Sequence, residues 1–342
     1  MSPRVLLTGA TGYIGGTVLD TLVSTHPDYD VTVLLRNVPE NFRSTYPNVK
    51  IVNGHFDSTD IIADAASQAD IVIHHGLPLH DASLNALITG LLRRSEQSFL
   101  IRLSGSVMAS DFMEEARLGS LNQKTWSDLY DVDTIASERP NALVDSGGVI
   151  VRTAAAEHGK KLKVAIIVPP ATYGPGRGLG RTQSIPLPRY VIEAKKLGAA
   201  FYYGDGTNSQ GWVHIEDLAK LYMKLVEAAA AGGGSATWGE KGFYFTSSQE
   251  VSQLNIARAA AKILKREGVV ESDEPKQISL DELDGMLVNY RFPFASRYMF
   301  ASNSRSKADR AKCDLEWKPD APGLLEVIEP DLLEALRNPQ PC

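Results

Sequence analysis

Near its start the chain reads Thr8-Gly9-Ala10-Thr11-Gly12-Tyr13-Ile14-Gly15-Gly16, and this stretch decides the fold. It follows an apolar run and opens a helix-like stretch. Gly9 permits a tight turn, Gly12 lets the main chain approach a diphosphate, and Gly15 lets the helix pack close to a sheet. The N–H groups at the helix start favour a negative charge. The context favours a dinucleotide-binding loop over a plain glycine-rich turn, with contacts from Gly9, Thr11, Gly12, Tyr13, Ile14 and Gly15.

Working outward from this loop, short apolar runs alternate with helix-like stretches. The runs typical of strands are Arg4–Thr8, Val31–Leu35, Lys50–Val52, Asp70–His74, Ser98–Leu103, Lys163–Val168 and Gly242–Phe245. The helix-like stretches are Gly15–Ser24, Thr59–Ser67, Asp81–Arg94, Gly147–His158, His214–Ala230 and Ser252–Arg266. This alternation predicts the α/β class: a doubly wound parallel Rossmann sheet with a smaller C-terminal part that covers the substrate.

Two regions break the alternation. Residues 174–211 and the tail from about Val269 are rich in Gly, Pro, Arg and aromatic residues. We therefore expect residues 1–175 to form a Rossmann domain that binds a dinucleotide, completed by about residues 212–262. Residues 176–211 and 263–342 are expected to form a smaller substrate-binding part.

The end of the second strand bears on the choice of dinucleotide. An NAD enzyme usually places Asp or Glu there, whereas this chain has Arg36, about twenty residues beyond the glycine loop. A guanidinium attracts a 2′-phosphate that a carboxylate would repel. The cofactor is therefore predicted to be NADP(H), the alternative being a solvated Arg36. Asp57 ends the third strand and is expected near the adenine amine, although an ordinary turn would also use it.

Composition narrows the function further. The 342 residues carry a net charge of −6, and their Lys and Arg are dispersed, which argues against a nucleic-acid partner. Cys313 and Cys342 lie far apart, so neither a disulfide framework nor a CxxC metal site is expected. No window approaches the roughly 20 apolar residues of a membrane helix. The chain also runs from Met1 directly into a strand, so we expect a cytoplasmic protein with a small-molecule substrate.

Four ordered segments resemble extended and atypical short-chain dehydrogenases/reductases, including their NAD-dependent epimerase/dehydratase-like and NmrA-like branches. They are Thr8–Gly16, Val168–Gly176, Gly211–Leu218 and the pair Ser304–Ala308 with Leu315–Pro319. The resemblance implies that Pro169 lies on main chain passing the nicotinamide. It also implies a possible homodimer, by analogy alone.

The chain departs from this family at the proton-transfer end. The family's chemistry uses Tyr-x-x-x-Lys, whose side chains share one helix face and move a proton while hydride transfers. That pair should fall near Pro140 to Val144, yet residues 139–148 contain neither Tyr nor Lys. Val168 and Gln210 also stand where the family often has Arg. The chain thus keeps the residues that bind the cofactor in this family, but it lacks the residues that transfer the proton.

Four residues are candidates to replace the missing pair. His75 and His80 follow the fourth strand, where ligands bind in open α/β sheets, and histidine is the side chain most often suited to acid–base chemistry near neutral pH. Ser104 ends the fifth strand, and Tyr173 lies in the turn near the expected nicotinamide. Each has a structural alternative: a core position for one histidine, a helix cap for His80, a turn for Ser104 and packing for Tyr173.

The loop after the fourth strand also bears on cofactor and metal binding. Gly76 in this loop is expected to contact the cofactor. Its histidines lack the carboxylate spacing of a metal site, and no metal is predicted.

The sequence therefore favours an NADP(H)-dependent oxidoreductase that reduces a small, apolar organic metabolite, as in secondary metabolism. Hydride transfer would use a non-standard proton donor. Two alternatives stay open: a redox-neutral isomerase, dehydratase or cyclase, and a non-catalytic NADP(H) sensor. Aromatic side chains are available to wall an apolar ligand: Tyr202, Tyr203, Trp212, Phe292 and Phe294.

Overall fold

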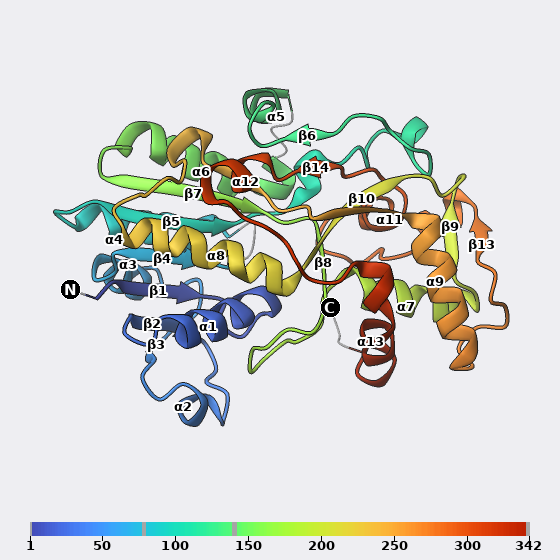
Figure 1. Cartoon of the computed structure of the whole chain (residues 1–342), viewed down its shortest axis with the longest axis horizontal. Helices are drawn as coiled ribbons and strands as arrows, with labels where there is room; N and C mark the ends of the chain where they lie inside the picture. Colours follow the sequence, from blue (N-terminus) through green and yellow to red (C-terminus); the bar gives the residue numbers. More distant parts are fainter. Residues whose placement is uncertain (1, 77–79, 139–141, 340–342) are drawn as a thin grey trace.

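A computed structural model of the chain describes residues 2–76, 80–138 and 142–339, without the side chains between 136 and 145. Its centre is a seven-stranded, fully parallel sheet (Figure 1). The strands, in sheet order, are β11 (Phe243–Phe245), β7 (Leu162–Val168), β5 (Ser98–Leu103), β4 (Ile71–His74), β1 (Arg4–Thr8), β2 (Asp30–Leu35) and β3 (Lys50–Asn53). All seven predicted strands are confirmed to within one residue at each end.

Helices cover both faces of this sheet, because successive side chains of a strand point to opposite sides. Leu7 packs with α1 (Tyr13–Thr25) and α8 (Ile215–Ala230) in one core layer. Leu6 packs in the layer of the other face. The helices of that face are α3 (Thr59–Ser67), α4 (Asp81–Arg93) and α6 (Ala142–His158). The predicted doubly wound α/β fold is therefore confirmed.

A second apolar core lies beyond the carboxyl ends of the strands. It is built by α7 (Pro186–Leu197), α9 (Gln253–Arg266), α10 (Leu280–Asp284), α11 (Ala295–Phe300), α13 (Leu324–Arg337), β9 (Phe201–Tyr203) and β13 (Lys276–Ile278). A small sheet of β8 (Ala171–Tyr173), β10 (Ser209–His214) and β12 (Gln249–Ser252) contributes to both parts.

Helix α9 lies in another part of the molecule than the sequence led us to expect. The sequence assigned residues up to about 262 to the Rossmann domain. Instead, Ile256, Ala260 and Leu264 of α9 are buried in the second core, where the helix packs against α13 and β9. Its apolar face fits either part, so periodicity alone did not indicate which one it covers.

The remaining elements are short and peripheral. They are α2 (Phe42–Thr45), α5 (Val132–Glu138), α12 (Asp309–Leu315), β6 (Trp126–Ser127) and β14 (Ser306–Lys307). Strands β6 and β14 pair in parallel, which ties the long segment after β5 to the C-terminal region. Within the described ranges, no helix has the length and apolar character needed to cross a membrane.

Candidate functional site

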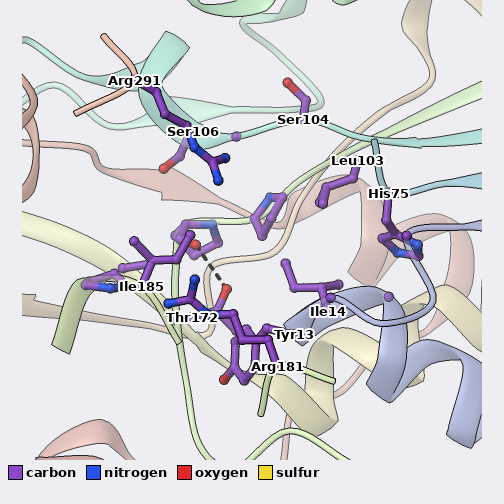
Figure 2. Close-up of a pocket in the computed structure, with 18 of the residues that line it drawn as sticks. Tyr13, Ile14, His75, Leu103, Ser104, Ser106, Thr172, Arg181, Ile185 and Arg291 are labelled. Atoms are coloured by element: carbon purple, nitrogen blue, oxygen red, sulfur yellow. Dashed lines mark hydrogen bonds between the residues drawn. The ribbon is translucent and has the colours of Figure 1, made fainter. Parts of the chain in front are cut away.

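A cavity of about 510 Å³ opens at the carboxyl ends of β1, β4, β5 and β7, between the sheet and the second core. The glycine loop forms one end, and residues 290–299 contribute to the other. Figure 2 shows Tyr13 and Arg181 on one wall, Ser106 and Arg291 opposite, and His75 at the edge. This position, where the strand order changes direction next to β1, is where open α/β sheets bind ligands.

The glycine loop has the close packing that its sequence predicts. Gly9 has a φ of +75°, and a Cβ there would lie 2.5 Å from the His75 carbonyl oxygen. A Cβ on Gly15 would lie 2.3 Å from the Gly9 carbonyl oxygen. Gly12 caps α1, and its N–H donates to the Gly9 carbonyl at 2.9 Å. Side chains at Gly9 or Gly15 would therefore displace the main chain of the loop.

The first turn of α1 suits a diphosphate. Gly12 supplies no side-chain cap, and the turn carries no acidic residue. The N–H groups of Tyr13, Ile14 and Gly15 have no acceptor within the helix, because first-turn amides precede the i→i−4 ladder. Since these residues line the cavity, the helix end offers the amides and the dipole that an anion requires.

A strap, residues 174–184, crosses over the glycine loop. The Tyr13 hydroxyl donates to the Gly174 carbonyl at 2.7 Å. The Arg181 N–H donates to the Thr11 carbonyl at 2.9 Å. The side chain of Tyr13 thus binds the strap, whereas its main-chain N–H remains available to a cofactor phosphate.

Of the other predicted cofactor residues, Arg36 and Asp57 are exposed and outside the cavity lining, whereas two others belong to it. Arg36 is exposed beyond β2 and makes no ion pair with another described residue. Asp57 is also exposed, and its carboxylate lies 3.0 Å from His80 Nε2, which is the main cause of its lowered pKa. Gly76 and Pro169 line the cavity. A Cβ on Gly76 would lie 2.2 Å from the His74 ring, so this position also requires glycine.

The two candidate histidines have structural roles. His75 packs against the Tyr222 ring at 4.9 Å, and neither of its ring nitrogens has a hydrogen-bond partner among the described residues. Burial lowers the pKa of His75 to about 3, so the ring stays neutral. His80 caps α4 by accepting the Ser83 N–H at 3.3 Å. These contacts correspond to the core and cap alternatives and do not support the predicted acid–base roles.

Tyr173 also faces away from the cavity. Its hydroxyl donates to the Pro322 carbonyl at 2.6 Å and accepts from Gln249 at 2.7 Å. Burial raises the pKa of Tyr173 to about 12. A hydroxyl engaged on both sides within the second core is a packing element, so this candidate is also unsupported as a proton donor.

Ser104 and Ser106 lie at the wall that faces the glycine loop. Ser104 lines the cavity, but Figure 2 shows its hydroxyl directed away from the other labelled side chains. The N–H of Ser106 donates to the Pro169 carbonyl at 3.2 Å, and its Oγ lies 3.2 Å from the hydroxyl of Tyr298. This Ser106–Tyr298 pair joins the end of β5 to α11.

Sequence reasoning missed Tyr298. It lies about 190 residues from Ser106, and no local motif marks it. The only signal was the aromatic, Arg-rich tail. Gln210 donates to the Tyr298 carbonyl at 2.6 Å, so the residue that replaces the family's Arg holds α11 in place.

The expected position of the usual pair lies largely outside the described residues. Residues 139–141 are not described, nor are the side chains up to 145. The sequence there still lacks Tyr and Lys. Among the described residues, no group of three or more His, Cys, Asp or Glu gathers as metal ligands.

Comparisons with known proteins agree with this architecture. A model of the NAD-dependent epimerase/dehydratase family matches residues 147–238, and an NmrA-like family model matches residues 1–80. The oxidase ucsJ of an Acremonium species is 28% identical over 341 residues, which cover 96% of each chain. An uncharacterized protein of Saccharomyces cerevisiae is 26% identical over 333 residues, which cover 95% of this chain and 97% of that one.

Two solved structures illustrate the shared fold. The dTDP-glucose 4,6-dehydratase of Bacillus anthracis, in complex with NAD, has a TM-score of 0.65 at 14% identity, covering 98% of this chain and 97% of that one. The UDP-glucose 4-epimerase of Thermotoga maritima has a TM-score of 0.63 at 15% identity, covering 98% and 99%. These solved structures share the fold of this chain, and parts of its sequence match models of the NAD-dependent epimerase/dehydratase and NmrA-like families.

Proposed function

We propose that this chain is an NADP(H)-dependent oxidoreductase that reduces a small organic molecule, with Tyr298 as the proton donor. One observation carries the proposal. A single cavity has the glycine loop at one end and the Ser106–Tyr298 hydroxyl pair at the other.

Several features support a nicotinamide dinucleotide. The first turn of α1 presents amides without a competing acidic side chain. The solved dehydratase relative contains NAD, and the full-length Acremonium relative is named an oxidase. Arg36 at the end of β2 supports the phosphorylated form. A nicotinamide bound with its diphosphate on this loop would supply hydride at the Ser106 end.

Tyr298 has the properties of an acid at neutral pH. Burial raises its pKa, so the hydroxyl is protonated at neutral pH; although it is a weaker acid than a solvated tyrosine, it can still protonate the more basic alkoxide or nitrogen anion formed by hydride addition. Ser106 is placed to orient that hydroxyl and to hydrogen-bond the same substrate atom. The main-chain bond from Ser106 to Pro169 fixes the serine at the segment expected to pass the nicotinamide.

Turnover with a substrate panel tests the proposal. The full-length protein is incubated with NADPH and carbonyl, imine and activated-alkene compounds, while absorbance at 340 nm and product mass are followed. Oxidised cofactor with a product two hydrogens heavier is the expected result. An isomeric or dehydrated product with unchanged cofactor would instead indicate a redox-neutral enzyme. Cofactor binding without turnover across the panel would indicate a sensor.

A further inference from the structure

Three arginines lie on the side of the cavity formed by the strap, α7 and the segment before α11. Arg181 on the strap and Arg291 just before α11 line the cavity. Figure 2 shows their side chains entering it from opposite walls. Arg189 of α7 stands behind them, with its guanidinium 5.6 Å from the ring centre of Tyr290, another lining residue. This side of the cavity therefore carries concentrated positive charge.

The charge of these arginines is not balanced by neighbouring acids. Within the described residues, no carboxylate forms an ion pair with Arg181, Arg189 or Arg291. Nearby arginines differ: Arg177 on the same strap pairs with Asp20 at 3.2 Å and with Glu216 at 3.1 Å. The arginines at the cavity thus differ from Arg177 in having no ion-pair partner among the described residues.

Burial makes the charge of Arg189 costly without a nearby anion, whereas Arg181 is half-buried and Arg291 is exposed. Arg189 is only 7% exposed, although a buried charge is ordinarily paired. Burial lowers the pKa of Arg181, and the charges of Arg189 and Arg291 lower it further. Like charges held together in this way would be stabilised by an anion between them.

Arg181 is also held in place before any ligand arrives. Its Nε donates to the Gln183 carbonyl and its Nη2 to the Ser184 carbonyl, both at 2.9 Å. A guanidinium has five N–H donors, so the Nη1 donors remain for a ligand. A fixed guanidinium loses little side-chain freedom on binding a carboxylate.

We infer that the substrate carries a carboxylate, held between Arg181 and Arg291, on an apolar or aromatic body that packs against Phe292 and Tyr298. This rests on the proposed function, because the cofactor would occupy the other end of the same cavity. Phe292 and Tyr298 contact each other edge to face, with ring centres 5.9 Å apart, and form an aromatic wall beside the charge. The family's Arg at position 210 is Gln here, so the positive charge comes from other segments of the chain.

A matched pair of probes tests the inference. Naphthalene-2-carboxylate and naphthalene-2-carboxamide have nearly equal size and shape but differ in charge. Both are titrated calorimetrically into the full-length protein saturated with NADP⁺. We expect the carboxylate to bind at least tenfold more tightly than the amide. Arg291→Gln should remove most of that preference, whereas Arg43→Gln, an exposed arginine on α2, should leave it unchanged.

Three results would overturn the inference. The first is equal binding of the two probes, or no binding of the carboxylate at millimolar concentration. The second is a carboxylate preference that survives both Arg291→Gln and Arg181→Gln. The third is an Arg181→Gln variant that loses NADP⁺ affinity but keeps the preference, since Arg181 would then serve the cofactor diphosphate. If the wild-type protein binds no NADP⁺ at all, the proposed function fails instead.

Discussion

The cofactor end of the cavity is built from main chain, whereas the substrate end is built from side chains. Nine consecutive residues, Thr8–Gly16, supply the loop and the helix amides of the cofactor end. The substrate end draws Ser106 from the end of β5, Arg181 from the strap, and Arg291 and Tyr298 from the region of α11. The main-chain end tolerates little change at Gly9 and Gly15, because a Cβ at either position would meet main-chain atoms. A side-chain site can be rebuilt one residue at a time on the same fold.

The strongest test of the main-chain end is Gly15→Ala. The added Cβ would lie 2.3 Å from the Gly9 carbonyl oxygen, so the loop must shift. We expect dinucleotide affinity to fall at least a hundredfold, or about 2.7 kcal/mol. We also expect the free energy of unfolding to fall by roughly 1–3 kcal/mol from overpacking. Fluorescence titration with NADPH and urea denaturation measure the two effects.

Gly285→Ala is the matched control, because Gly285 ends α10 with helical φ and ψ, far from the glycine loop in the chain. It should bind NADPH as the wild type does. Normal binding by Gly15→Ala would mean that the loop does not carry the diphosphate.

At the side-chain end, Tyr298→Phe removes one hydroxyl and keeps the ring. If Tyr298 donates the proton, kcat should fall about 100-fold. NADPH affinity should stay within twofold, because the ring still packs beside Phe292. Steady-state kinetics with the best substrate of the panel measure the change. Tyr130→Phe, at an exposed tyrosine, is the control, and an unchanged kcat in Tyr298→Phe would remove the donor assignment.

The sequence predicted the sheet and the glycine loop because both depend on local pattern. The central parallel strands are buried on both faces and read as apolar runs, whereas the edge strand β3 is shorter and partly exposed. The loop reads as glycines at fixed spacing between a strand and a helix. Local position also indicated the helix-cap alternative for His80, which directly precedes α4 and caps it in the structure.

The substrate end was not predictable in the same way. Ser106 and Tyr298 meet only through tertiary packing, and no spacing in the chain relates them. The surroundings of His75 were not predictable for a related reason. Strand direction indicated that it lies at the ligand edge, but not that its ring turns beneath α1 toward Tyr222. Which side of a loop a side chain faces depends on neighbours that the sequence does not reveal locally.

His75 offers a test of whether the floor of the cofactor end is structural. Its pKa falls from 6.5 in the unfolded chain to about 3 in the fold, because burial disfavours the charged ring. The buried neutral ring therefore does not lower the free energy of unfolding above about pH 6.5. Below that pH the unfolded chain binds a proton that the folded chain does not, so the free energy of unfolding falls. At pH 5 the loss is about 2 kcal/mol.

Replacing His75 should remove this pH dependence. Urea denaturation at pH 7 and pH 5 should show a stability loss about 2 kcal/mol smaller in His75→Leu than in the wild type. His158→Leu, at an exposed histidine near the end of α6, should match the wild type. An equal loss in His75→Leu would mean that the His75 ring titrates normally and remains available for acid–base chemistry.

The smallest expected effect concerns the outer rim of the cofactor end, where a side chain rather than the main chain chooses the ligand. Arg36 is exposed, so its attraction for a 2′-phosphate is weakened by solvent and salt. Arg36→Ala should therefore weaken NADPH binding about tenfold, or 1.4 kcal/mol. NADH, which has no such phosphate, should bind within twofold of the wild type, and Arg43→Ala should affect neither. Equal losses for both nucleotides would assign Arg36 a structural role and leave the cofactor preference to the backbone around β2.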